Sequence, residues 1–225
     1  MEKWPIGVFT SVGAGLGAGL DTVKSLGVNT VQLHTPHGPD RAPDRVAQFR
    51  KQFADAGIQV TVVFAGFEGE SYADIPTVQK TIGLVPPESR AARLAETKAI
   101  SDFTKAMGCD ALGMHIGFVP EDASDPNYAG VVQAAQEVCD YCKTNGQRFH
   151  LETGQEKADV LLHFFQDVGR DNLAINFDPA NLILYGTDQP IPALKQVGRY
   201  VKSVHCKDAK RQAGVGGGWA GVETP

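Results

Sequence analysis

One local pattern recurs six times along this 225-residue sequence and limits the folds open to it. A segment with helical character ends at a glycine, and a short apolar run follows at once or within a few residues. Helices commonly stop at a glycine in the left-handed conformation, and short loops then lead into the next strand. The pattern predicts alternating helices and strands, with helix ends at Gly27, Gly57, Gly108, Gly146, Gly169 and Gly198.

The apolar runs predict strands that are buried on both faces. VTVVF, LGMHI and LAINF contain almost no polar residues, which is typical of a parallel sheet covered by helices. Alternating strands and helices form either an open doubly wound sheet or a closed barrel. We expect seven strands, at about 5–12, 29–35, 58–65, 111–117, 147–152, 173–178 and 200–206.

Polar residues at the ends of the predicted strands favour the barrel. A closed barrel brings the carboxyl ends of all its strands to one central site, whereas an open sheet spreads them along an edge. We therefore predict an α/β fold, a single (β/α)8 TIM-barrel domain over 1–225, with the eighth βα unit missing from this chain. The residues at these strand ends are His34, His115, Glu152, Asp178 and His205.

The glycine-rich stretch GAGLGAGLDTV (13–23) matches the dinucleotide pattern G-x-G-x-x-A. A dinucleotide fold also needs an acidic residue at the end of the second strand to hold the ribose. The second strand here ends in His34 and Thr35, so we do not expect a dinucleotide. The glycines either let the first loop approach a ligand or make it flexible. A second long segment, 65–88, is expected to be a lid or a specificity element, with Phe67, Glu68 and Tyr72 as candidates to line a pocket.

Composition excludes several classes of protein. A net charge of −5 and a pI of about 5.7 disfavour nucleic acid as a partner. We find neither a secretory signal nor an apolar run long enough to span a membrane. Cys139 and Cys142 form C-x-x-C within a predicted helix and are interpreted as core residues rather than zinc ligands. We expect a cytoplasmic protein.

Glu152, Asp178 and His205 end three successive strands and are each separated by one βα unit. In a barrel their side chains would face a common centre. Two carboxylates and one imidazole suit a divalent cation such as Mn²⁺, Mg²⁺, Co²⁺ or Zn²⁺. The alternative is that each acid only caps the helix that follows it.

The motifs HLETG, NFDPANLILYG and SVHCKD resemble the sugar isomerase/epimerase branch of the xylose isomerase-like TIM barrels. The resemblance implies that Glu152, Asp178 and His205 hold one metal, together with a glutamate of strand eight that is expected beyond Pro225. Many members have D-x-x-H after strand six, and Asn181 stands in place of that histidine here.

By this resemblance we expect a metal-dependent isomerase or epimerase of a sugar or sugar phosphate, working by proton transfer through an enediolate with Glu152 as the catalytic carboxylate. Its partner would be a small sugar, and unpaired sheet edges would favour a homo-oligomer. The alternatives are a hydroxypyruvate isomerase or inosose dehydratase, an endonuclease IV-like hydrolase, and a non-catalytic barrel fragment. The candidate substrate-binding residues are His34, His115, Asn181 and Lys207.

Overall fold

A computed structural model describes residues 3–12 and 16–224 of the chain. Its main sheet is parallel, and each strand pairs with its neighbours in sequence order. All the strands expected from the sequence are present, each somewhat shorter than expected. They are β1 (Gly7–Ser11), β2 (Thr30–His34), β3 (Gln59–Phe64), β4 (Ala111–Met114), β5 (Arg148–Glu152), β6 (Leu173–Phe177) and β7 (Val201–Val204).

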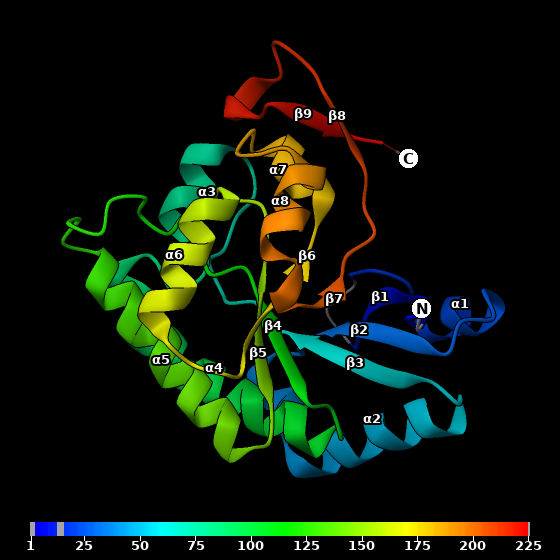
Figure 1. Cartoon of the computed structure of the whole chain (residues 1–225). Helices are drawn as coiled ribbons and strands as arrows, with labels where there is room; N and C mark the ends of the chain where they lie inside the picture. The colour runs from blue at the N-terminus through cyan, green and yellow to red at the C-terminus, as the bar shows by residue number, and fades with distance from the viewer. Residues whose placement is uncertain (1–2, 13–15, 225) are drawn as a thin grey trace.

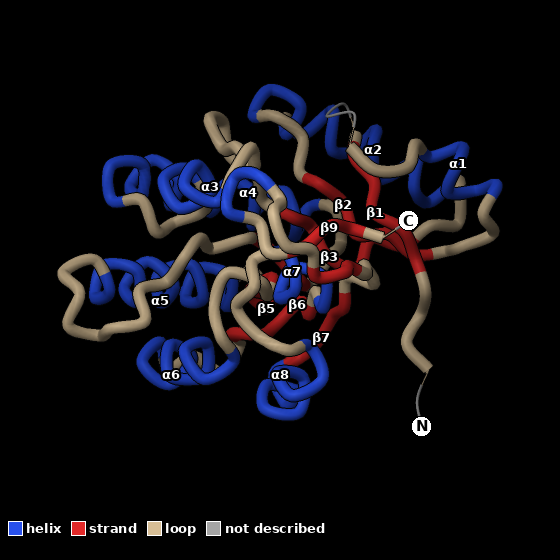
Figure 2. The backbone as a smooth tube through the Cα atoms, turned by 90° about the horizontal axis from the view of Figure 1, so that it is seen from above, coloured by secondary structure: helices blue, strands red, loops and turns tan. Residues whose placement is uncertain are grey.

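Helices surround this curved sheet, as Figures 1 and 2 show. The arrangement is the predicted TIM barrel, and the described residues contain no eighth parallel strand. The helices are α1 (Leu20–Ser25), α2 (Pro43–Asp55), α3 (Ile75–Thr81), α4 (Pro87–Ala106), α5 (Tyr128–Thr144), α6 (Ala158–Val168), α7 (Pro179–Leu184) and α8 (Pro190–Val197), with short 3-10 turns η1 (Gly38–Arg41), η2 (Gly198–Tyr200) and η3 (Gly216–Gly218).

The helices bury apolar side chains against the sheet. Val46, Phe49 and Phe53 of α2 are buried against the sheet. Cys139 and Cys142 of α5 are also fully buried, which confirms their assignment to the core. No helix in the described part of the chain combines the length and the hydrophobicity that crossing a bilayer would require.

The predicted glycine helix ends are confirmed at five of the six positions, where φ is positive. Gly198 is the exception, because its φ of −52° is right-handed and it opens the turn η2. The sequence pattern is the same, but a 3-10 turn here carries the chain into β7. Of the glycine-rich stretch, Gly13 and Gly15 lie outside the described residues.

The end of that stretch is tied back to β1. The N–H of Ala18 donates to the carbonyl of Phe9 at 2.8 Å, and the Thr10 hydroxyl donates to the carbonyl of Ala18 at 2.5 Å. At Gly17, with φ of +69°, a methyl group would come within 2.3 Å of the Phe9 carbonyl oxygen. Close packing on β1 therefore requires a glycine at position 17.

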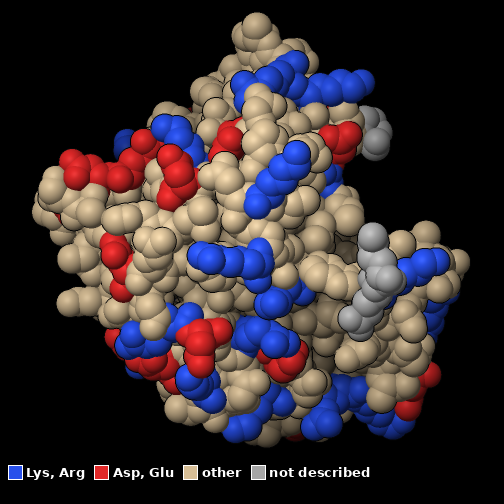
Figure 3. Space-filling model, in the orientation of Figure 1, with Lys and Arg blue, Asp and Glu red and all other residues tan. Residues whose placement is uncertain are grey.

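A two-stranded antiparallel hairpin that the sequence patterns did not predict follows β7. It consists of β8 (Ala209–Arg211) and β9 (Gly221–Glu223), and we call residues 209–223 the roof hairpin. It lies on α7, above the carboxyl ends of the strands (Figure 1). In Figure 3 both charge signs are spread over the visible face, and the surface is notched between the roof hairpin and the side of the molecule that carries β1 and α1.

The segment expected to be a lid contains α3 and is held by a partly buried carboxylate. Glu70 accepts the N–H of Phe67 at 3.0 Å and that of Gly83 at 2.7 Å. Gly83 has a φ of +69°, and a methyl group there would lie 2.1 Å from the carbonyl oxygen of Ile116. The segment is thus fastened to the chain that leaves β4.

We predict that Gly83→Ala destabilises the fold far more than Gly69→Ala. Both glycines have positive φ, but a methyl group at Gly69 would meet no atom within 4 Å. Gly69→Ala should lower the free energy of unfolding by about 1 kcal/mol, and Gly83→Ala by at least about 3 kcal/mol, because a backbone clash is added to the strain. Urea unfolding measures both values, and equal losses would contradict this account of the segment.

Candidate metal centre

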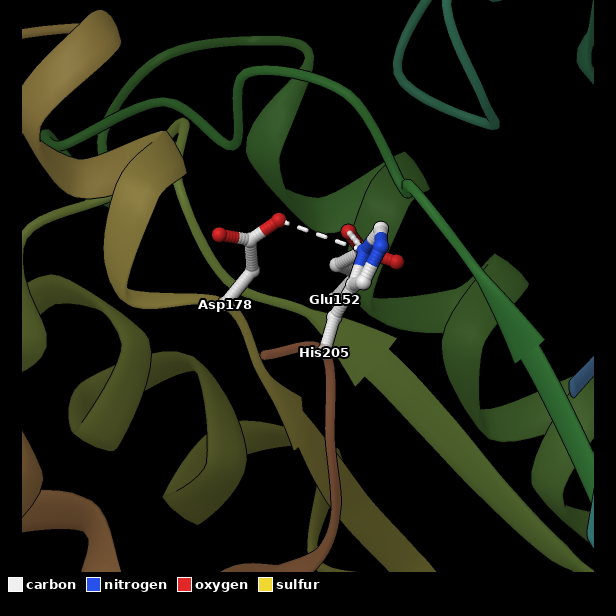
Figure 4. A group of neighbouring side chains, drawn as sticks. All are labelled: Glu152, Asp178 and His205. Carbon is white, nitrogen blue, oxygen red and sulfur yellow. Dashed lines mark hydrogen bonds and ion pairs between the residues drawn. The ribbon is translucent and has the colours of Figure 1, made fainter. Parts of the chain in front are cut away.

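Three strand ends bring Glu152, Asp178 and His205 together. Glu152 is the last residue of β5, Asp178 follows β6 directly, and His205 follows β7. Figure 4 shows the three side chains pointing toward one another. One candidate ligand atom from each residue lies within 4.8 Å of the other two. The juxtaposition predicted from the sequence is therefore present in the structure.

Glu152 is buried and surrounded by nitrogen atoms. Its Oε1 lies 3.1 Å from Nδ1 of His205 and 3.5 Å from Nε2 of His115, and it accepts a hydrogen bond from Asn181 at 3.3 Å. Burial alone would raise the pKa of Glu152, but the positive charge of His115 and His205 outweighs burial and lowers it to about 2. Glu152 is thus ionised at neutral pH.

Asp178 uses its two oxygens differently. Oδ1 accepts the N–H of Asn181 at 3.0 Å and caps α7. Oδ2 lies 3.3 Å from Nδ1 of His205 and 3.2 Å from Nζ of Lys207, yet it accepts no hydrogen bond in spite of full burial. The capping role and the ligand role are therefore compatible, because a different oxygen serves each.

The three side chains fit a divalent cation. The neighbouring carboxylates Asp178 and Glu152 raise the pKa of His205 to about 10, so the site holds a protonated imidazole where no cation is bound. The buried Oδ2 of Asp178 has free acceptor capacity, and the donor set of two oxygens and one nitrogen suits Mg²⁺, Mn²⁺, Co²⁺ or Zn²⁺.

Three of the four candidate substrate-binding residues adjoin this centre. His115 and Asn181 contact Glu152, and Lys207 contacts Asp178. Lys207 also donates to Oδ1 of Asn181 at 2.8 Å and pairs with Glu223 of the roof hairpin at 3.3 Å. Their role toward a substrate stays a prediction.

His34, the fourth candidate, is separated from the centre by the side chain of Phe9. Phe9 packs between the two histidine rings, with its centroid 6.3 Å from that of His34 and 6.1 Å from that of His205. Nδ1 of His34 lies 2.9 Å from the carbonyl oxygen of Thr35. The assignment of His34 to substrate binding is untested by these contacts.

A pocket of about 450 Å³ opens beside the centre, between the barrel mouth and the roof hairpin. This volume is in the range of small-molecule sites. Of the three residues expected to come from the segment 65–88, only Tyr72 lines the pocket. The full lining is Tyr72, His115, Asn181, Leu184, Tyr185, Lys207, Val215, Trp219, Gly221, Val222 and Glu223.

Two polar residues that the sequence did not single out follow β5. Gln155 is buried, and its Nε2 lies 3.5 Å from Nδ1 of His115 and 3.4 Å from the hydroxyl of Tyr185. Glu156 is buried and accepts the N–H of Val119 at 3.1 Å. The available signal was their position directly after the strand that ends in Glu152. Polar residues are also common at the start of a helix, so this position did not distinguish them.

His150 belongs to the barrel interior. It is buried on β5, its Nδ1 lies 2.8 Å from the hydroxyl of Ser203, and burial lowers its pKa to about 3. Its ring is thus neutral, and it contacts none of the candidate ligands in the described structure.

The chain belongs to the xylose isomerase-like TIM barrel family, whose model matches residues 20–222. The solved Xylose isomerase domain protein from Planctomyces limnophilus is 56% identical, with a TM-score of 0.94, and the match covers 98% of this chain and 78% of that protein. No protein of curated function matches this sequence.

More distant solved structures share the fold. A xylose isomerase-like TIM barrel protein from Mycobacterium smegmatis, in complex with magnesium, is 21% identical, with a TM-score of 0.66 over 92% of this chain and 71% of that one. A D-psicose 3-epimerase from Clostridium cellulolyticum H10, solved with D-tagatose, is 17% identical, with a TM-score of 0.64 over 83% of this chain. This chain spans 65% of that epimerase, which is less than two thirds of its length.

We predict that Asp178→Asn weakens Mn²⁺ or Mg²⁺ binding at least about a hundredfold, because even outer-shell partners of a metal commonly contribute roughly 10- to 100-fold. The amide oxygen of Asn still caps α7, so the helix is kept. Calorimetric titration with each ion measures the affinity. Asp208→Asn is the matched control, because the Oδ1 of Asp208 accepts the neighbouring N–H of Ala209. Equal affinities in the two variants would exclude Asp178 as a ligand.

We predict that Glu156→Gln stabilises the protein at pH 8 and leaves its stability unchanged near pH 4. Burial raises the pKa of Glu156 to about 8, so folding favours the protonated acid. The folded state holds more protons than the unfolded state between about pH 4.3 and 8, and stability contributed by the neutral acid is lost as pH rises through this window. The side-chain oxygen of glutamine can still accept the N–H of Val119. Unfolding free energies over this range measure the effect, and parallel pH curves would contradict it.

Proposed function

We propose that this protein is a divalent-metal-dependent isomerase or epimerase of sugars, and that it works by proton transfer through an enediolate. The observation that carries the proposal is the buried set Glu152, Asp178 and His205 beside a pocket of substrate size. A hydroxy-carbonyl compound has adjacent oxygens that suit such a centre. Loss of the proton from the carbon that bears the hydroxyl group is the step common to isomerisation and epimerisation.

In this proposal Glu152, Asp178 and His205 hold the metal ion. When bound, the ion would polarise the substrate carbonyl and stabilise the negative charge that develops as the proton leaves. The protein residues bind the substrate, orient it and move the proton.

Glu152 is the proposed acid/base group. Its ionised carboxylate can accept a proton. The side-chain amide of Asn176 donates a hydrogen bond to Oε2 of Glu152 at 3.4 Å. Gln32 in turn donates to Oδ1 of Asn176 at 3.1 Å, which orients that amide. These two hydrogen bonds keep the carboxylate fixed in place. One base that returns the proton to a neighbouring carbon produces isomerisation, and a second base on the opposite face produces epimerisation.

His115, Asn181 and Lys207 are proposed to orient the substrate hydroxyl groups. They lie between the candidate centre and the pocket, and each carries hydrogen-bonding nitrogen atoms. Asn181 cannot become cationic as a histidine can, so it would hold a hydroxyl group without supplying a charge.

The family and the solved epimerases support this function. The distant relative from Clostridium cellulolyticum H10 is a D-psicose 3-epimerase, and the one from Mycobacterium smegmatis was solved with magnesium. The proposal includes a cytoplasmic location, a small sugar as partner and a homo-oligomeric state. The four cysteines are free, which suits a reducing compartment.

Solvent deuterium exchange tests the function. Ketoses incubated in D2O with the protein and Mn²⁺ or Mg²⁺ should gain deuterium next to the carbonyl, and a chelator should stop the exchange until the ion is restored. Glu152→Gln should reduce the exchange rate by about 10² to 10⁴, the usual contribution of an acid/base group. Asp208→Asn is the control. If no ketose exchanges in the presence of any divalent ion, the proposed function is wrong.

A further inference from the structure

The pocket beside the candidate centre has two unlike walls. Polar groups form the side that adjoins the ligands, and aromatic and aliphatic groups form the side built by α7 and the roof hairpin. A sugar has the same two-sided character, with hydroxyl groups at its edge and C–H groups on its faces. The polar wall consists of His115, Asn181, Lys207 and Glu223, and the apolar wall includes Leu184, Tyr185, Val215, Trp219 and Val222.

Trp219 is held in this wall by several independent contacts. Its ring centroid lies 5.0 Å from that of Tyr185, which directly follows α7. The next residue, Ala220, donates its N–H to the carbonyl of Leu184 at 2.8 Å. A methyl group at Gly186 would lie 2.7 Å from the Cβ of Ala220, so the two backbones approach closely. The indole is therefore positioned before any ligand enters, and such preorganisation favours binding.

The basic side chains that line the pocket already lie beside acidic partners. Nε2 of His115 lies 3.5 Å from Glu152. Lys207 lies 3.2 Å from Asp178 and 3.3 Å from Glu223. Among the described lining residues there is no further Lys, Arg or His. Phosphate recognition normally uses unpaired basic groups, whereas Glu223 adds a half-exposed negative charge to the pocket.

We propose that the substrate pocket binds an uncharged sugar in preference to a sugar phosphate, and that Trp219 is the residue against which the C–H face of the sugar packs. This inference rests on the proposed function and specifies its substrate class. An aromatic ring provides a large apolar surface at low entropic cost, while the opposite wall offers donors and acceptors to the hydroxyl groups.

The two tryptophans allow a direct binding experiment. Trp4 precedes β1 and so lies at the opposite end of the barrel from the pocket, half-exposed to solvent. In a Trp4→Phe protein, Trp219 is the single fluorescent indole. We expect a saturable change of its emission on titration with D-fructose or D-tagatose in the presence of Mg²⁺, and at least tenfold weaker binding of the corresponding 6-phosphates.

Three variants separate the contributions. Trp219→Ala should weaken sugar binding about tenfold in calorimetry, whereas Trp219→Phe, which keeps a flat ring and the hairpin contacts, should stay within about threefold. Glu223→Gln removes the negative charge and frees Lys207 from one partner. We expect this variant to reduce the ratio of the two binding affinities, free sugar over 6-phosphate, at least threefold.

Each outcome decides one point. Sugar binding that leaves Trp219 emission unchanged and is insensitive to Trp219→Ala overturns the role of Trp219. Equal or tighter binding of the 6-phosphates overturns the substrate class, and no binding of either sugar form overturns both. Deuterium exchange confined to sugar phosphates would refute this inference and support the proposed isomerase function. Saturable binding of free sugars without deuterium exchange would refute the proposed isomerase function and support the inferred preference for uncharged sugars.

Discussion

The charge balance around Glu152 and Asp178 is the interaction on which the site depends. Two carboxylates buried side by side lose their hydration, so their charged forms need compensating positive charge. His205 lies between them, 3.1 Å from one carboxylate and 3.3 Å from the other. Lys207 adds a second cation beside Asp178. Each metal-dependent function considered for the barrel mouth uses this cluster, because it concentrates acceptor atoms that a divalent ion would draw together.

The parallel sheet explains why these residues meet. Its strands all run the same way, so residues far apart in sequence end at the same edge. Short helix-to-strand turns keep neighbouring strands adjacent, and apolar side chains on both faces bury the sheet between its layers. Segments that leave this edge then build the pocket. The chain after β4 contributes His115, the chain after α7 contributes Tyr185, and the roof hairpin contributes Trp219.

Sequence reasoning recovered the features that follow from local periodicity. The strands and the meeting of Glu152, Asp178 and His205 result from apolar patterning and one βα spacing. It did not recover the roof hairpin, because β8 and β9 are three residues each and mostly exposed, so no apolar period marks them. Glu156 was missed for a related reason. An acid at a helix start is ordinary, and its burial depends on the chain around Val119, which no local pattern encodes.

Asp178 joins coordination chemistry to the architecture of the pocket. One of its oxygens begins α7, and the other faces the candidate ion. The last turn of α7 carries the roof hairpin through the bond from Ala220 to Leu184. If the proposed metal ion binds here, it would therefore act on the same carboxylate that anchors the helix beneath Trp219. The ion and the geometry of the sugar pocket would then be coupled through a single side chain.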